Sequence, residues 1–180
     1  MNDIAAELAK LHVLEGAEFV MQLKAIAASN EFHPLKDNPS IYATGATSNA
    51  DYDNLLAAAR KAVDLGYKVY ILPNPSGTRT ADYILERKGV YKLFELKSIS
   101  GKSSANDRLI ESIGQTNHVI LNLLTDYNAR KLAKDIQTNF EANREAREVL
   151  IMKGNKMLSV SHRFVEGKDY VKMFMKRYLR

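Results

Sequence analysis

Apolar residues recur at steps of three and four along the start of the chain, from residue 3 to residue 28. This spacing places them on one face of an amphipathic helix, and Gly16 is the residue at which the helix would divide. The next residues, 33–45, contain two prolines and several Gly, Asn, Ser and Thr residues, which argue against a long helix or strand. We therefore predict an N-terminal helical extension and loop over residues 1–45.

The pattern in the middle of the chain changes from a helical period to a strand period. Ser48 or Asn49 can cap a helix that Gly66 ends, and two runs rich in β-branched and aromatic residues flank a turn at Gly89. Such runs joined by a short glycine-containing turn are typical of an antiparallel hairpin. The elements predicted here are a helix over 52–65, a strand over 67–72 and hairpin strands over 80–86 and 90–98.

Helical and strand patterns continue to alternate through the rest of the chain. The last helix is basic, with Lys172, Lys176, Arg177 and Arg180 predicted to face outward. This alternation indicates an α/β fold whose mixed sheet of about five strands is flanked by helices, although strand order does not follow from it. The elements predicted here are helices over 107–114, 128–146 and 168–180 and strands over 118–124, 148–153 and 156–162.

Composition places the chain among ordinary globular proteins. It has 180 residues, of which 46% are hydrophobic and 26% charged, so disordered, fibrous and collagen-like classes are excluded. No apolar run approaches the ~20 residues of a membrane helix, and the start MNDIAAELAK lacks a signal-peptide core, so we expect a cytoplasmic protein without a membrane partner. The absence of cysteine excludes disulfides and thiolate chemistry. A formal charge of +5 suits a nucleic-acid ligand, although many other proteins share it.

One group of polar residues in the predicted hairpin could carry chemistry. Asp82 lies in the first strand, and Glu95 and Lys97 lie two apart in the second, so the latter two project from the same face. Inside an apolar strand they cost desolvation energy unless they pair or bind something. Two carboxylates can hold Mg²⁺ or Mn²⁺, and a lysine beside them can stabilise charge on a phosphate. The alternative is an exposed hairpin with a surface Glu/Lys pair.

The residues 51–124 resemble the PD-(D/E)XK nuclease superfamily. They show a helix, a Gly-Tyr pair, a strand, a proline loop, an acidic residue, a hairpin with the tripeptide ELK, and a further helix and strand. More narrowly, LGYKVYILPNPSGTRTADYILERKGVYKLFELKSISGK is similar to the C-terminal tRNase domains of contact-dependent growth-inhibition toxins. Ala81 stands where the family usually has proline, a position that only shapes the backbone. The resemblance implies a restriction-endonuclease-like fold over residues 46–180.

The resemblance also implies roles for individual residues. Asp82 and Glu95 would bind the metal ion, and Lys97 would stabilise charge or position water. Gln115 would be a further polar residue of the catalytic site, with a hydrogen bond to the backbone at a helix end as the competing interpretation. Asp53 is the candidate for an additional acid, with helix N-capping as the competing interpretation. The candidates for substrate contact, which would otherwise belong to polar loops, are Arg79, Ser98 and Lys102.

Two classes of function follow from these expectations. The first is a metal-dependent endonuclease, with tRNA favoured as substrate and DNA as the alternative, and with a cognate immunity protein if the chain is a toxin that is delivered into a target-cell cytoplasm. The second is a non-catalytic nucleic-acid-binding module, or a structural protein of a phage or mobile element. Nothing in the sequence determines the oligomeric state or the role of residues 1–45.

Overall fold

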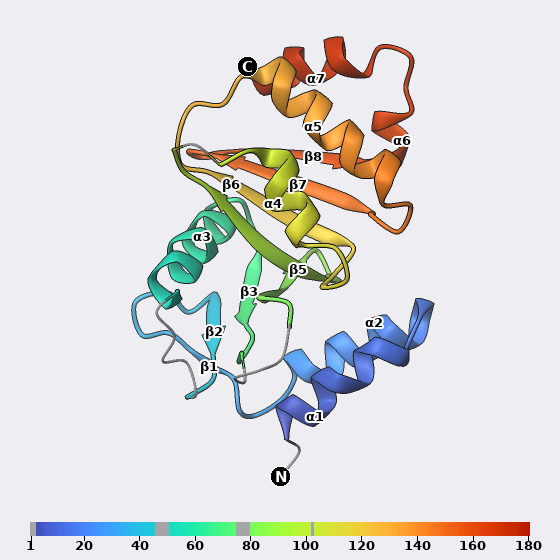
Figure 1. The fold of residues 1–180 in the computed structure, drawn as a ribbon. Helices are drawn as coiled ribbons and strands as arrows, with labels where there is room; N and C mark the ends of the chain where they lie inside the picture. Colours follow the sequence, from blue (N-terminus) through green and yellow to red (C-terminus); the bar gives the residue numbers. More distant parts are fainter. Residues whose placement is uncertain (1–2, 46–50, 75–79, 102) are drawn as a thin grey trace. The chain divides into compact units, whose positions relative to one another are not determined.

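The structure is a computed structural model that describes residues 3–45, 51–74, 80–101 and 103–180. These residues form seven α-helices, one 3₁₀ helix and eight strands (Figure 1). The contacts divide the chain into two compact units, the first ending at Phe94 and the second beginning at Glu95. The predicted α/β class with a mixed sheet is therefore confirmed. Within the described ranges, no helix is both long and apolar enough to cross a membrane.

The first unit combines helices with strands that pair mostly antiparallel. Strands β1 to β5 neighbour each other in sequence order, and only β2 and β3 are parallel. The helical elements are α1 (Ile4–Ala9), a 3₁₀ helix (Lys10–Val13), α2 (Gly16–Ala27) and α3 (Tyr52–Asp64). The strands are β1 (His33–Pro34), β2 (Ile41–Ala43), β3 (Lys68–Ile71), β4 (Tyr83–Arg87) and the first half of β5 (Val90–Ile99).

Local chemistry sets the ends of these helices. The Asp3 carboxylate accepts a hydrogen bond from the Ala5 N–H at 3.0 Å, which satisfies one of the donors exposed at the start of α1. Gly16 adopts φ +57°, a left-handed conformation that favours glycine, and α2 begins there, as the sequence predicts. Gly66, at φ +92°, likewise follows the end of α3.

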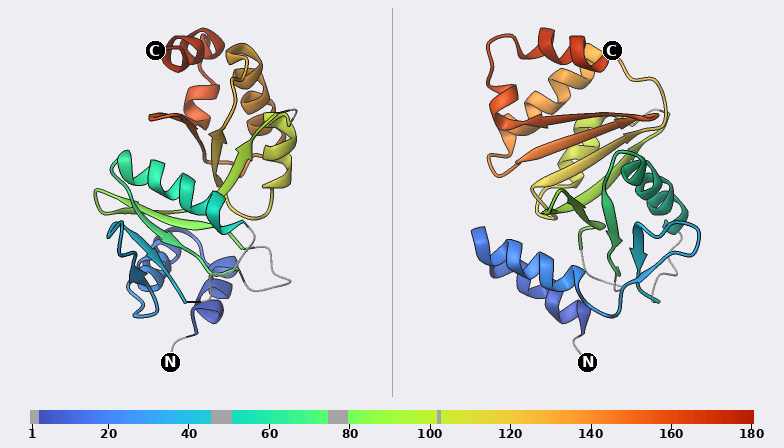
Figure 2. Two further views of the ribbon diagram at one scale, coloured as in Figure 1. Left: turned by 90° about the vertical axis from the view of Figure 1, so that its left-hand side faces the viewer. Right: turned by 180° about the vertical axis from the view of Figure 1, so that it is seen from behind.

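Helices cover both faces of the strands in the first unit. One face packs Tyr70, Ile84 and Leu93 against apolar side chains of α1 and α2. On the other face, the Tyr83 hydroxyl donates to the Leu55 carbonyl of α3 at 2.6 Å. The left panel of Figure 2 shows α3 on one side of these strands and α1 and α2 on the other. The N-terminal helices therefore complete the core of the first unit, and the domain boundary expected between residues 45 and 46 stays a prediction.

Tyr70 makes the first unit sensitive to alkaline pH. Burial raises the pKa of Tyr70 to about 12, with a smaller contribution from Tyr91 and Tyr42. In the unfolded chain the phenol ionises near its ordinary pKa of about 10. The stabilisation is therefore complete below pH 10 and is lost as the pH rises from about 10 to about 12. We expect the free energy of unfolding, measured with urea, to fall over this window and to fall less in Tyr70→Phe; an equal slope in both proteins would contradict this assignment.

The second unit is a sheet with parallel strands in its interior. From Glu95 onward β5 is parallel to β6, β6 is parallel to β7, and β8 pairs antiparallel to β7. Its remaining strands are β6 (His118–Leu123), β7 (Glu148–Lys153) and β8 (Lys156–Ser161). Its helices are α4 (Ala105–Glu111), α5 (Ala129–Ala142), α6 (His162–Val165) and α7 (Tyr170–Tyr178).

The four helices of the second unit pack on the same face of its sheet. Parallel neighbours need a crossover connection, and α4 and α5 supply it between β5 and β6 and between β6 and β7. The side chains beneath them alternate along each strand, so that Val119, Leu121 and Leu123 of β6 enter one core with Phe140 and Phe174. Alternate side chains of β5, beginning with Glu95, project from this same face.

The strand count of the sequence prediction is wrong. About five strands were expected, and the described residues contain eight. The six strand segments recognised in the sequence are present, and β1 and β2 are additional, in a stretch predicted to be loop. They were missed because strands of two and three residues are too short to show a period. The one-turn helix α6 was also missed, because the predicted last strand extends to His162; Ser161 caps α6 by accepting from the Phe164 N–H.

Candidate active site

Glu95 and Lys97 form an ion pair on the helix-covered face of the second unit. Lys97 Nζ lies 3.3 Å from Glu95 Oε1, and only 12% and 7% of the two side chains are exposed. Their register partners on β6 are Val119 and Leu121, both buried in the apolar core. The pair is thus a charged group within an apolar surface. The desolvation penalty of two buried charges can exceed their Coulombic attraction. The ion pair therefore contributes little to the stability of the fold, which suggests another role for the two charges.

The pair has the chemical properties needed for binding a metal ion and a phosphate. The Glu95 carboxylate offers the kind of oxygen ligand that a hard cation prefers, and the Lys97 ammonium lies beside it. The second carboxylate oxygen, Oε2, is buried as well. A lysine held by packing can also present its ammonium to the charge that develops on a phosphate during hydrolysis. The same two side chains can therefore serve a cation and an anion.

Asp82 belongs to the first unit, directly before β4. Its N–H donates to the Phe94 carbonyl at 3.0 Å, and its own carbonyl accepts from the Leu72 N–H at 2.9 Å. The backbone of Asp82 is thus held between β3 and β5, and its side chain is half-buried. Phe94 is joined to Glu95 by a peptide bond. Asp82 and Glu95 belong to different units, so the convergence of their side chains stays a prediction.

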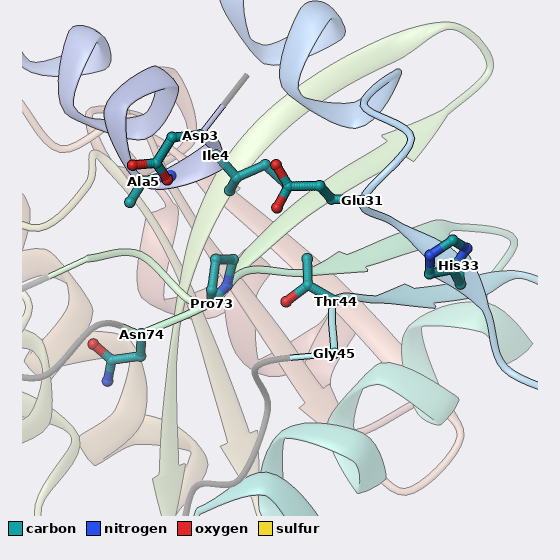
Figure 3. Close-up of a pocket in the computed structure, with 9 residues that line it drawn as sticks. All are labelled: Asp3, Ile4, Ala5, Glu31, His33, Thr44, Gly45, Pro73 and Asn74. Atoms are coloured by element: carbon teal, nitrogen blue, oxygen red, sulfur yellow. The ribbon is translucent and has the colours of Figure 1, made fainter. Parts of the chain in front are cut away.

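A pocket of about 420 Å³ opens in the first unit, where β2 and β3 end (Figure 3). It reaches Pro73, the residue after the Leu72 that holds Asp82, and it includes two carboxylates, Asp3 and Glu31. Sequence reasoning assigned neither acid to a site. Asp3 caps α1, and no periodicity connects Glu31 to the loop after β3, because the connection arises only from packing. The remaining lining residues are Ile4, Ala5, His33, Thr44, Gly45 and Asn74.

The structure places Gln115 between α4 and β6 in the second unit. Its N–H donates to the Ser112 carbonyl at 3.1 Å, so the backbone is held in a turn. Its side-chain oxygen Oε1 is buried and has no hydrogen-bond partner among the described residues. A buried polar atom without a partner costs about 1–3 kcal/mol, which is an argument for a ligand at this position. Glu95 pairs with Val119, four residues after Gln115, so both lie toward the same end of the parallel strands.

Among the other predicted site residues, the structure describes Ser98 and Asp53. Ser98 follows Lys97 in β5 and therefore projects from the opposite face, where it lies beside Asn122 of β6. Asp53 is exposed in the first turn of α3, in the first unit. Arg79 and Lys102 lie outside the described residues.

A second polar group on the other face of the second unit was not predicted. Glu148, at the start of β7, accepts from the Ser159 hydroxyl at 2.5 Å and lies 3.3 Å from the His118 ring nitrogen Nδ1. The sequence predicts only a structural role for His118 at a strand end. Its partners come from β7 and β8, so no local spacing could have identified the group. The three side chains join three strands at one end of the sheet.

The donor atoms of the predicted site fit a hard divalent cation. Asp82 and Glu95 offer carboxylate oxygens and Gln115 an amide oxygen, the ligand types that Mg²⁺ and Mn²⁺ prefer. Lys97 already neutralises part of this negative charge, so a cation there needs further oxygens, which a substrate phosphate and water can supply. Among the residues that the structure describes, no three His, Asp or Glu side chains gather into a metal-binding group.

Comparison of the chain with protein-family models, with curated proteins and with solved structures gave no match. The function must therefore be inferred from the residues themselves.

Proposed function

We propose that the chain is an endonuclease that requires Mg²⁺ or Mn²⁺ and hydrolyses phosphodiester bonds of nucleic acid. The observation that carries the proposal is the buried ion pair of Glu95 and Lys97. A charged pair on an apolar face, with a half-buried aspartate reached through the hairpin, has no evident value for stability. It does have the groups that metal-assisted phosphate chemistry needs.

Each residue has a distinct role in this proposal. Asp82 and Glu95 hold the metal ion, which when bound lowers the pKa of a coordinated water and withdraws charge from the phosphate. Lys97 orients the attacking water or stabilises the negative charge that the phosphate gains in the transition state. Gln115, whose amide oxygen is buried, would bind the metal ion or the attacking water.

RNA is the favoured substrate, and transfer RNA in particular. This preference rests on the similarity of residues 51–124 to tRNase toxin domains, and DNA remains the alternative for the same chemistry. A toxin of this kind would be delivered into a target-cell cytoplasm and would be neutralised by a cognate immunity protein. The non-catalytic alternative is a nucleic-acid-binding module that uses the same fold.

The first experiment is a cleavage assay with metal removal. We expect purified protein to cut either total tRNA or plasmid DNA in Mg²⁺ or Mn²⁺ and to lose this activity in excess EDTA, with products resolved on a denaturing gel. Adding excess metal back to the EDTA-treated sample should restore cleavage, which excludes irreversible inactivation. Cleavage that persists in EDTA would contradict the metal requirement. No cleavage of either substrate with either metal would favour the binding module.

A further inference from the structure

The net positive charge of the chain arises in its last thirty residues. Residues 151–180 contain eight Lys and Arg but only two Asp and Glu, whereas residues 1–150 contain eighteen and nineteen. The net charge of +5 therefore comes entirely from this segment, which lies within the second unit. A segment that is this biased creates a local positive potential even though the rest of the chain is near neutral.

Helix α7 arranges part of this charge on one exposed face. Tyr170, Phe174 and Tyr178 recur every four residues and are buried in the core of the second unit. Val171 and Met175 pack partly against the same core, whereas Lys172 and Lys176 project from the opposite side of the helix. The exposed basic side chains are Lys172 and Lys176 on this side, Arg177 on the flank of the helix and, just after the helix, Arg180. Arg177 is held over the Phe164 ring of α6, 4.6 Å from its centre, so its position is set by packing.

The turn between β7 and β8 extends this basic face beyond the end of α7. Lys156 Nζ donates to the Arg180 carbonyl at 2.5 Å, and Lys153 Nζ lies 4.8 Å from the centre of the Tyr178 ring. A pocket of about 530 Å³ lies at this junction, lined by both lysines together with Tyr178 and Leu179. We call the exposed face of α7 together with this turn the basic ridge.

We propose that the basic ridge binds the phosphate backbone of nucleic acid. This inference rests on the proposed function for its substrate class, but the charge and geometry of the ridge support it separately. Three cations along a helix of nine residues, with Arg180 directly after it, suit a linear polyanion better than a single phosphate. The backbone is the part of a nucleic acid that Lys and Arg bind without regard to sequence.

The same features argue against a membrane surface as the partner. A helix that lies in a lipid interface buries a broad apolar face in the membrane, whereas the apolar face of α7 is already packed in the protein core. On the outer side, the exposed large apolar residues are Met173 and Leu179, at 38% and 66%. They are too few to form an inserting surface.

The basic ridge is separate from the buried ion pair within the second unit. In the sheet register Glu95 aligns with Val149 through Val119, and Lys153 lies four residues further along β7. Two strand spacings of about 4.8 Å and four residues of about 3.3 Å place Lys153 roughly 16 Å from Glu95. A substrate that meets both regions must be several nucleotides long. The ridge should therefore affect affinity and leave the chemical step unchanged.

The test measures binding while cleavage is blocked. The triple variant Lys172→Gln, Lys176→Gln, Arg177→Gln is compared with the charge-matched control Lys10→Gln, Lys36→Gln, Lys68→Gln, which alters exposed lysines of the first unit. In EDTA, the affinity of each protein for a fluorescein-labelled 20-nucleotide single-stranded RNA and for total tRNA is measured by anisotropy from 50 to 300 mM NaCl. Circular dichroism melting confirms that both variants are folded.

We expect the ridge variant to bind at least about tenfold more weakly than the wild type at 50 mM NaCl. Its slope of log K against log salt should be shallower by about 2, since each lost phosphate contact on a single strand contributes about 0.7. The control should change the slope by less than half as much. Equal weakening in both variants would mean that only net charge matters, and it would overturn the assignment. So would unchanged binding in the ridge variant, or binding of polyglutamate or anionic phospholipid vesicles as tight as that of RNA.

The outcome for the basic ridge can be separated from the outcome for the nuclease. If the cleavage assay fails while the ridge variant loses affinity, the ridge stands and the chain is a binding module. If cleavage occurs and the ridge variant keeps both its affinity and its KM, the nuclease stands and the ridge proposal is wrong.

Discussion

Asp82→Asn should lower the rate of metal-dependent cleavage by at least about 100-fold. The substitution keeps the shape of the side chain and both backbone hydrogen bonds to Leu72 and Phe94, but it removes a charge that the proposed metal ion needs. A catalytic metal ion supplies several kcal/mol of transition-state stabilisation, and each 1.36 kcal/mol corresponds to a factor of ten in rate. The measurement is the initial rate on the substrate found in the cleavage assay, at saturating Mg²⁺ or Mn²⁺.

The matched control for this prediction is Asp64→Asn, which removes the charge of an exposed carboxylate at the end of α3. It should cleave at the wild-type rate. Both variants should keep the wild-type free energy of unfolding within about 1 kcal/mol, because neither side chain is fully buried. An Asp82→Asn protein that is folded and still cleaves at the wild-type rate would refute the assignment of this residue.

Lys97→Met should destabilise the folded protein by about 3–5 kcal/mol, in addition to lowering cleavage. The substitution leaves the buried Glu95 carboxylate without the ammonium that lies 3.3 Å away. Removing one partner of a buried ion pair has this cost because the remaining charge stays desolvated. Urea unfolding of Lys97→Met and wild type at pH 7, with the same probe, measures the difference.

The double variant Glu95→Met, Lys97→Met separates stability from function. Replacing both charges with apolar side chains of similar volume should restore stability to at least the wild-type level and exceed it by as much as about 4 kcal/mol. The double variant should nevertheless be inactive in cleavage. If the double variant is less stable than Lys97→Met alone, the ion pair stabilises the fold. The main argument for a functional role of the buried charges would then be lost.

The predicted element types agree with the structure wherever the pattern extends over several residues. The apolar residues recur every four residues in α7 and every second residue in β6. These periods arise because one face of each element is buried. The mistakes concern elements too short to repeat a period: β1, β2 and α6 have two, three and four residues. Their existence depends on partners elsewhere in the chain.

The same distinction applies to the candidate site. Glu95 and Lys97 share a face because side chains alternate along a strand, and this feature could be predicted from the sequence alone. That the pair is buried depends on β6 and on the helices that cover this face, which no local pattern reveals. The grouping of His118 with Glu148 and Ser159 likewise needed the pairing of three strands.

The sequence by itself determined the α/β class, most of the helices and strands, and the hairpin that carries Asp82, Glu95 and Lys97. Those features are local, because backbone propensity and side-chain period act over a few neighbouring residues. Only the tertiary structure decided the order of the strands, the burial of the Glu95–Lys97 pair and the junction of Lys156 with Arg180. These features join residues that are distant in the chain, and the free energy of packing and desolvation that selects them is not encoded in any short segment.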